Sequence, residues 1–101
     1  MMKIQVKSVH FHADSKLLAF IEEKISRLNR YFEHTLEAEV HLKLQDTGAR
    51  VREKIAEIRL KVPGSVLVYK KSGKTFEVAV HAAADNLKRQ LVQFKERRNR
   101  S

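Results

Sequence analysis

The sequence predicts an α+β fold in which a four-stranded sheet carries two helices on one face, as a two-layer sandwich of order β-α-β-β-β-α. Three observations support this prediction. Apolar and polar residues alternate in four separate segments, as they do in half-buried strands. Two other segments repeat their apolar residues at helical spacing. Each predicted helix has a single apolar stripe, so both helices should cover the same face of the sheet.

The first strand is expected within residues 3–11, where Ile4 and Val6 point to one side. The alternation changes phase near Ser8, which either a bulge or the end of the strand would explain. Asp14 is a suitable N-cap for a helix that should run to about residue 32. The apolar stripe of that helix consists of Leu17, Leu18, Ile21, Ile25, Leu28 and Phe32.

Three further strands, expected at residues 36–44, 56–62 and 66–70, should form an antiparallel meander. Asp46-Thr47-Gly48 and Pro63-Gly64 provide the turn signals between them. The inward face of the last strand stays open, because residues 66–69 are all apolar or aromatic. The intervening helix allows a right-handed crossover, so the first two strands can be parallel neighbours.

The last helix is expected to begin after a Thr75 cap, preceded by a basic turn at residues 70–74. Its apolar stripe consists of Phe76, Val80, Ala83, Leu87, Leu91 and Phe94. After about residue 97 the chain has no further apolar anchor, so we expect the basic end of this helix to fray.

The composition indicates one domain, which we assign to residues 1–101. A chain of 101 residues with 43% hydrophobic residues can bury one modest core. Its 21 Lys and Arg residues against 12 Asp and Glu residues give a net charge of +9, which favours a polyanionic partner. The sequence has neither a signal-peptide core nor a run of about 20 apolar residues, so we expect no membrane span and a cytoplasmic location.

Signatures of catalysis are missing from the sequence. Its three glycines are scattered, so there is no phosphate-binding loop, and there is no cysteine. The acids lie among cations, which gives little support to a paired-carboxylate hydrolase. His10 and His12 would share a face on a strand, but a metal site needs further ligands. His81 lies off the apolar stripe and should be solvated. We therefore expect no enzyme, no metal, no cofactor and no small-molecule substrate.

Basic residues on the two helices are the candidate contacts with nucleic acid. If the helices pack side by side, their outward sides form one surface suited to phosphate backbones. Few aromatic residues accompany them, which favours recognition of RNA shape over base stacking. The alternative is a basic domain whose charge only prevents aggregation. The candidate RNA-binding residues are Lys24, Arg27, Arg30, Lys88, Arg89, Lys95 and Arg97.

Two segments, Arg-Leu-Asn-Arg-Tyr-Phe at residues 27–32 and Leu-Lys-Arg-Gln-Leu at residues 87–91, combine core spacing with basic positions. Together with the order of the other segments, they resemble the ribosome hibernation-promoting factor family, also called ribosome-associated inhibitors or sigma-54 modulation proteins. The likeness covers nearly the whole chain and is to the short form, because the chain ends before the second domain of long members.

The resemblance implies a fold similar to a double-stranded RNA-binding domain. It also implies binding to the small ribosomal subunit and its rRNA in the decoding cleft, across the tRNA and mRNA channel. Such a protein would silence dormant ribosomes by occupancy. Lys24, Arg27, Arg30, Arg89 and Arg97 match basic positions of the family.

The chain also departs from the family at three positions. His81 stands where the family often has Asp, and Asn86 and Gln93 stand where basic residues occur. Lys88 and Lys95 are neighbours that could replace those cations. The alternatives are a general double-stranded RNA-binding protein, a protein-interaction modulator of transcription and, more remotely, an RNA-cleaving enzyme.

Overall fold

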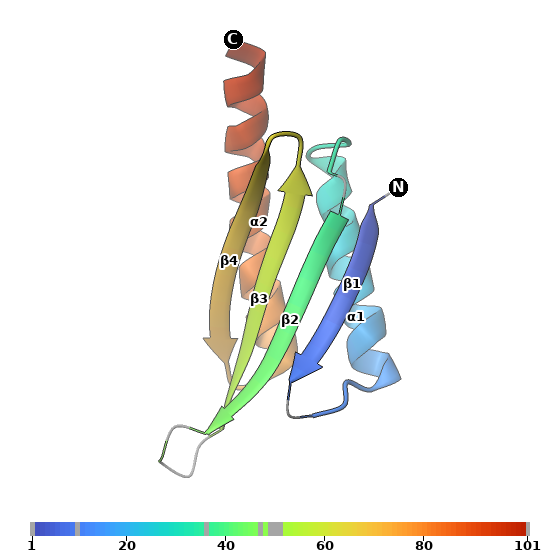
Figure 1. Ribbon diagram of the computed structural model, residues 1–101, viewed down its shortest axis with the longest axis vertical. Coiled ribbons are helices and arrows are strands. Elements are labelled where there is room, and N and C mark those ends of the chain that lie inside the picture. The colour runs from blue at the N-terminus through green and yellow to red at the C-terminus, as the bar shows by residue number, and fades with distance from the viewer. Residues whose placement is uncertain (1, 10, 36, 47, 49–51, 101) are drawn as a thin grey trace.

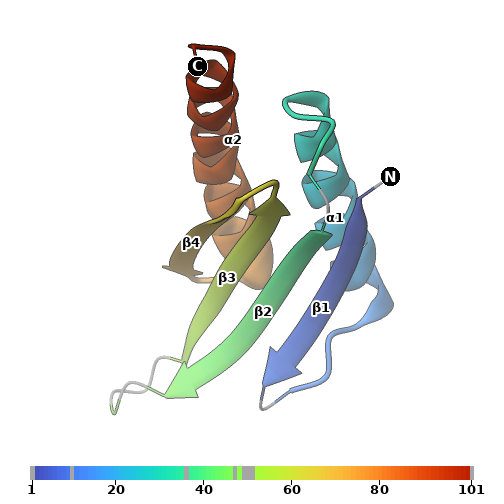
Figure 2. The ribbon, with the colours of Figure 1, turned by 45° about the horizontal axis from the view of Figure 1, so that its top comes forward.

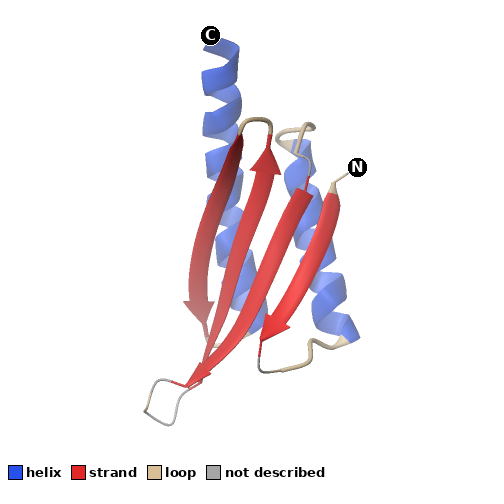
Figure 3. Ribbon diagram, in the orientation of Figure 1, coloured by secondary structure: helices blue, strands red, loops and turns tan. Residues whose placement is uncertain are grey.

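The computed structural model describes residues 2–9, 11–35, 37–46, 48 and 52–100. Four strands form one sheet in the order β1-β2-β3-β4, and both helices cover the same face of it (Figures 1 and 3). The predicted two-layer α+β fold is therefore confirmed. The elements are β1 (Lys3–Val9), α1 (Ser15–Ser26), the 3-10 helix η1 (Arg27–Arg30), β2 (Glu37–Asp46), β3 (Arg52–Val62), β4 (Ser65–Gly73) and α2 (Phe76–Arg100).

The first two strands are parallel neighbours, as the helical crossover between them allows (Figure 2). Their pairing runs without interruption from Lys3 opposite Glu37 to Val9 opposite Lys43. The described part of β1 therefore contains no bulge, and the phase change near Ser8 coincides with the end of the strand. The other neighbouring strands pair antiparallel, which completes the predicted meander.

The fourth strand is longer than its sequence indicated. We expected the strand to end at Lys70, where a basic turn would begin, but β4 continues through Lys71 to Gly73. Lys70 lies opposite Glu57 of β3, and both lysines are exposed, so the strand keeps its charges in water. The inward face of β4 is also settled, because Leu67 packs against the core whereas the exposed Val68 does not.

The first helix ends earlier than predicted. Instead of continuing to about residue 32, α1 stops at Ser26 and the chain tightens into η1. The Ser26 hydroxyl donates to the Glu23 carbonyl at 3.1 Å, and the Tyr31 N–H donates to the Leu28 carbonyl at 3.0 Å. The second is a backbone bond of the 3-10 type, which is common where an α-helix ends.

The second helix continues to Arg100, beyond residue 97, where we expected it to fray. The fraying itself stays a prediction.

The hydrophobic core lies between the sheet and the two helices. Ala79 and Ala83 of α2 are fully buried, and their small side chains let this helix approach the sheet closely. Phe32 and Phe94 meet edge to face with centroids 5.3 Å apart, which joins the two helical segments. The largest fully buried side chains are Ile21, Ile25, Val40, Leu42, Ile58, Leu60, Val80, Leu87 and Leu91.

Leu18 is an exception to the predicted apolar stripe, because it is 40% exposed. It lies towards β1, the last strand of the sheet on that side, where no further described strand extends the sheet to cover it.

Both predicted helix caps are present. The Leu17 N–H donates to the Asp14 carboxylate at 2.8 Å, and the Val78 N–H donates to the Thr75 hydroxyl at 3.0 Å. Each bond satisfies a backbone donor that the first helical turn leaves without a partner.

The Asp14 cap can be tested by substitution. We expect Asp14→Ala to lower the free energy of unfolding by about 1 kcal/mol, because Ala leaves the Leu17 N–H without its acceptor. Asp14→Asn retains a capping oxygen and should stay close to the wild type in urea denaturation. If both variants lose the same stability, charge rather than capping would be responsible.

Candidate nucleic-acid interface

Lys24 and Arg27 belong to the side of the first helical segment that faces α2. Lys24 lies about two turns before Tyr31 in the chain, and its ammonium group is 5.6 Å from the centre of the Phe20 ring. Arg27 is exposed at the start of η1. Two predicted contact residues thus lie on consecutive helical elements, Lys24 near the end of α1 and Arg27 at the start of η1.

Tyr31 is the point at which cations from both helical segments meet. The Lys88 ammonium of α2 lies 5.1 Å from the centre of the Tyr31 ring. Arg30 and Lys95 line a cavity of about 240 Å³ beside this tyrosine. The structure therefore brings Arg30, Lys88 and Lys95 together around one aromatic side chain.

Two of the predicted arginines already have acidic partners. Arg27 is paired with Glu23, and the Arg89 guanidinium lies 2.6 Å from the Asp85 carboxylate. Each acid precedes its arginine by four residues and is itself solvent-exposed. Exposed pairs of this kind contribute little stability, so an external anion can replace the carboxylate. The i, i+4 spacing is visible in the sequence and could have identified these acids.

Arg97 does not share the side of α2 that faces Tyr31. It follows Lys88 by nine residues, which places it about 180° around the helix. It lies instead towards the flank of Gln90, whose amide donates to the Val68 carbonyl of β4 at 3.2 Å. Arg98, which was not among the predicted contacts, lies 5.6 Å from the centre of the Phe32 ring.

The uncovered face of the sheet has a different charge distribution. Lys61 lies 3.4 Å from Glu37, and the Arg59 guanidinium lies 3.1 Å from Glu57. This face therefore mixes cations that are paired with acids and exposed lysines such as Lys7 and Lys70. We define the interhelix basic surface as Lys24, Arg27, Arg30, Lys88, Arg89 and Lys95.

Other kinds of site find no support among the described residues. No three His, Asp or Glu side chains in that part of the chain gather to hold a metal. His12 is exposed, whereas His10, its predicted neighbour, falls outside the described ranges. Within the same ranges, no helix has the length and apolar character needed to cross a membrane. His81 is exposed, as predicted.

Comparison with known proteins agrees with the resemblance predicted from the sequence. Residues 4–99 match the family described as sigma 54 modulation protein / S30EA ribosomal protein. The chain is 36% identical over 78 residues to the ribosome hibernation promotion factor of Deinococcus radiodurans, covering 77% of this chain and 41% of that protein. It is 30% identical over 96 residues to the ribosome hibernation promoting factor of Azotobacter vinelandii, covering 95% of this chain and 85% of that one.

Two solved structures share the fold. The N-terminal domain of Thermus thermophilus Protein Y superposes with a TM-score of 0.80 at 24% identity, covering 93% of this chain and 99% of that domain. A ribosomal subunit interface protein from Coxiella burnetii gives a TM-score of 0.82 at 19% identity, covering 95% and 99%.

The contact between Lys88 and Tyr31 can be measured with a double-mutant cycle. We expect Lys88→Met and Tyr31→Leu to show a coupling energy of about 0.5–1 kcal/mol in urea unfolding, as for an exposed cation–π pair. The control cycle pairs Lys16→Met, at the far end of the first helix, with Tyr31→Leu. It should show no coupling energy. A zero value for the Lys88 cycle would contradict the contact.

Proposed function

The chain belongs to the sigma 54 modulation protein / S30EA ribosomal protein family, and from that membership we propose that it is a ribosome hibernation factor. Its curated relatives are named as ribosome hibernation factors. The chain spans about two fifths of the length of the Deinococcus relative but most of the Azotobacter one. On this proposal the protein acts in the cytoplasm, where ribosomes are found.

The interhelix basic surface is the observation that carries the proposal. Its cations project from the two helical segments, and the two that have acidic partners, Arg27 and Arg89, are held only by exposed ion pairs. Guanidinium and ammonium groups held in fixed positions suit the regular spacing of RNA phosphates. We therefore propose that this surface contacts the rRNA of the small ribosomal subunit.

The mechanism that we propose is occupancy of the decoding cleft. The protein would lie across the tRNA and mRNA sites and exclude both ligands by its volume, without a chemical step. Arg27 and Arg89 would exchange Glu23 and Asp85 for phosphates, and Arg30, Lys88 and Lys95 would hold the backbone next to Tyr31. Arg97, on the β4 side of α2, would contact a different strand of RNA or none.

A second candidate function is general binding of double-stranded RNA. It is favoured by the scarcity of aromatic side chains on the interhelix basic surface, because readout of phosphates and shape requires no particular sequence. A role as a protein-interaction modulator of transcription rests on the family name alone. Binding that persists after nuclease treatment would favour that role.

Charge reversal tests the proposed surface. We expect Arg27→Glu with Arg89→Glu to weaken cosedimentation with purified small subunits by at least about tenfold, because each reversal removes a phosphate contact and adds repulsion. The matched control, Lys7→Glu with Lys70→Glu, changes the net charge equally on the uncovered sheet face. It should bind nearly as the wild type does.

Salt dependence and a competing RNA complete this test. Binding should fall with salt, with a log–log slope of roughly −0.7 to −0.9 for each neutralised phosphate. A plain RNA duplex should bind more weakly than the subunit. Equal affinities would favour the second candidate, and binding that is insensitive to salt or to the Arg27 and Arg89 reversals would refute the proposed surface.

Removing the acids that pair with Arg27 and Arg89 should strengthen binding to the small subunit. We expect Glu23→Gln and Asp85→Asn each to tighten subunit binding by about twofold to fivefold, because phosphate no longer competes with a carboxylate for the arginine. Glu57→Gln is the matched control, since Glu57 also pairs with an arginine but on the uncovered sheet face. If all three variants tighten binding alike, the effect is one of net charge.

A further inference from the structure

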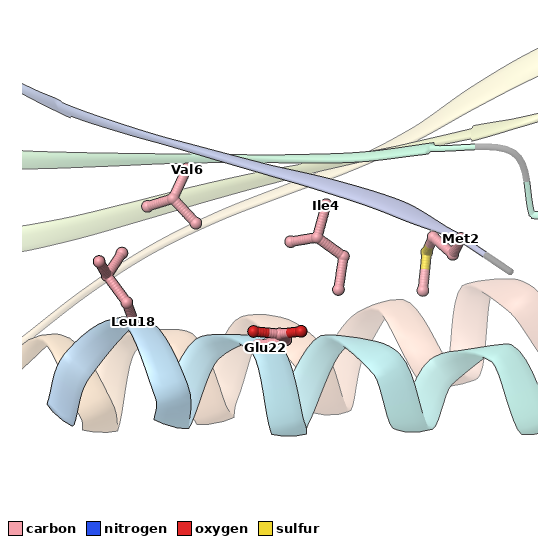
Figure 4. A pocket seen from close by; sticks show the side chains of 5 residues that line it. All are labelled: Met2, Ile4, Val6, Leu18 and Glu22. Carbon is pink, nitrogen blue, oxygen red and sulfur yellow. The ribbon is translucent and has the colours of Figure 1, made fainter. Parts of the chain in front are cut away.

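An open groove lies between β1 and α1 (Figure 4). In the fold, this flank of α1 faces away from α2 (Figure 1). Ile4 and Val6 point from the strand towards the helix, where Leu18 and Glu22 face them (Figure 4). Together with Met2, these side chains line a volume of about 390 Å³. Leu18 is 40% exposed, and Met2, Ile4 and Val6 are only partly buried. The apolar side chains that β1 and α1 contribute to this groove are therefore partly open to solvent.

The strand above this groove has a free edge. Within the described part of the chain, β1 pairs only with β2, so alternate backbone N–H and C=O groups on its outer side have no strand partner. The opposite edge of the sheet differs, because Gln90 of α2 donates to the Val68 carbonyl of β4. A free strand edge beside an apolar groove is the arrangement that binds an extended peptide by strand addition.

The charges around β1 specify the occupant further. Glu22 has no ion pair with any described residue, and it lies inside the groove. Lys3 and Lys7 are exposed on the other side of the same strand. A segment added to β1 alternates its side chains in the same way. It should therefore direct aliphatic residues and a Lys or Arg into the groove, and acidic residues towards the two lysines.

We propose that β1 and the adjoining groove bind an extended segment of another polypeptide with this alternating pattern. A second copy of this chain fits poorly, because antiparallel pairing of two β1 strands would set Lys3 of one copy near Lys7 of the other. The groove lies on the flank away from the interhelix basic surface, so both can be occupied together. The inference is independent of the proposed function, and its test requires no ribosome.

The test uses a designed peptide, acetyl-Thr-Glu-Leu-Glu-Lys-Glu-Leu-Glu-Thr-amide, titrated into the isotope-labelled protein and followed by NMR. We expect saturable shifts in the amides of β1 and of the groove side of α1. The control peptide, acetyl-Thr-Leu-Leu-Glu-Glu-Lys-Glu-Glu-Thr-amide, has the same composition and charge without the alternation. It should cause no shifts there. N-methylation of alternate backbone amides in the first peptide should abolish binding, because it removes the donors that pair with β1.

Exchanging the charges of Glu22 and of the peptide's central Lys tests whether the peptide binds in the groove. Glu22→Lys should weaken the alternating peptide roughly fivefold, the effect of losing one exposed ion pair. A peptide whose central Lys is replaced by Glu should then bind this variant better than it binds the wild type. Glu96→Lys is the matched control, because it makes the same charge change on an exposed position of α2. It should leave the original affinity within about twofold.

Three outcomes of the peptide experiments would overturn the proposal. The two peptides of equal composition could bind equally, the shifts could fall on the helices' basic side, or exchange at Glu22 could have no effect. Sedimentation equilibrium tests whether a second copy of this chain occupies the groove instead. A dimer that the alternating peptide dissociates would show that a second copy, and not another polypeptide, covers β1.

Discussion

The structure depends on one constraint: only one face of its sheet is apolar. The inward residues of β2 and β3 include Val40, Leu42, Ile58 and Leu60, all fully buried, whereas their outward neighbours are mostly charged. Two amphipathic helices of one chain must therefore share that face and lie side by side. Because their apolar stripes point inward together, their basic sides point outward together. The interhelix basic surface follows from the placement of the core.

Such a surface holds like charges close to one another, which opposes folding. The chain reduces this repulsion locally. Arg27 and Arg89 each have an acid one turn earlier, and Lys88 lies against the Tyr31 ring. All three interactions are exposed and weak, so they stabilise the free protein without preventing the same cations from meeting a stronger anion. The free protein can thus be stable while these cations stay available for a ligand, because Glu23, Asp85 and Tyr31 hold them only weakly.

Features that depend on a few neighbouring residues were predictable from the sequence. The Asp14 and Thr75 caps act over three residues, and the strand order follows from alternation and connection lengths. Features that depend on distant elements were not. The extension of β4 beyond Lys70 depends on pairing with β3, and the exposure of Leu18 depends on where the sheet ends. Which flank of α2 faces β4 depends on how the helix is rotated against the sheet. The RNA contacts of the seven predicted residues stay predictions, because contact with a partner is not encoded in the fold.

The length of α2 has a kinetic consequence. Its last turns extend beyond the turn between β3 and β4 (Figure 1), and Arg98 is the last of its residues seen against an aromatic ring of the core. Positive charge at a projecting helix end reaches further into solution than charge held between the helices. Under the proposed function, this charge would act mainly on the rate of encounter with RNA, and its contribution would fade as salt shortens the screening length. Under the same proposal, the cations around Tyr31 would act after encounter and would lengthen the lifetime of the complex.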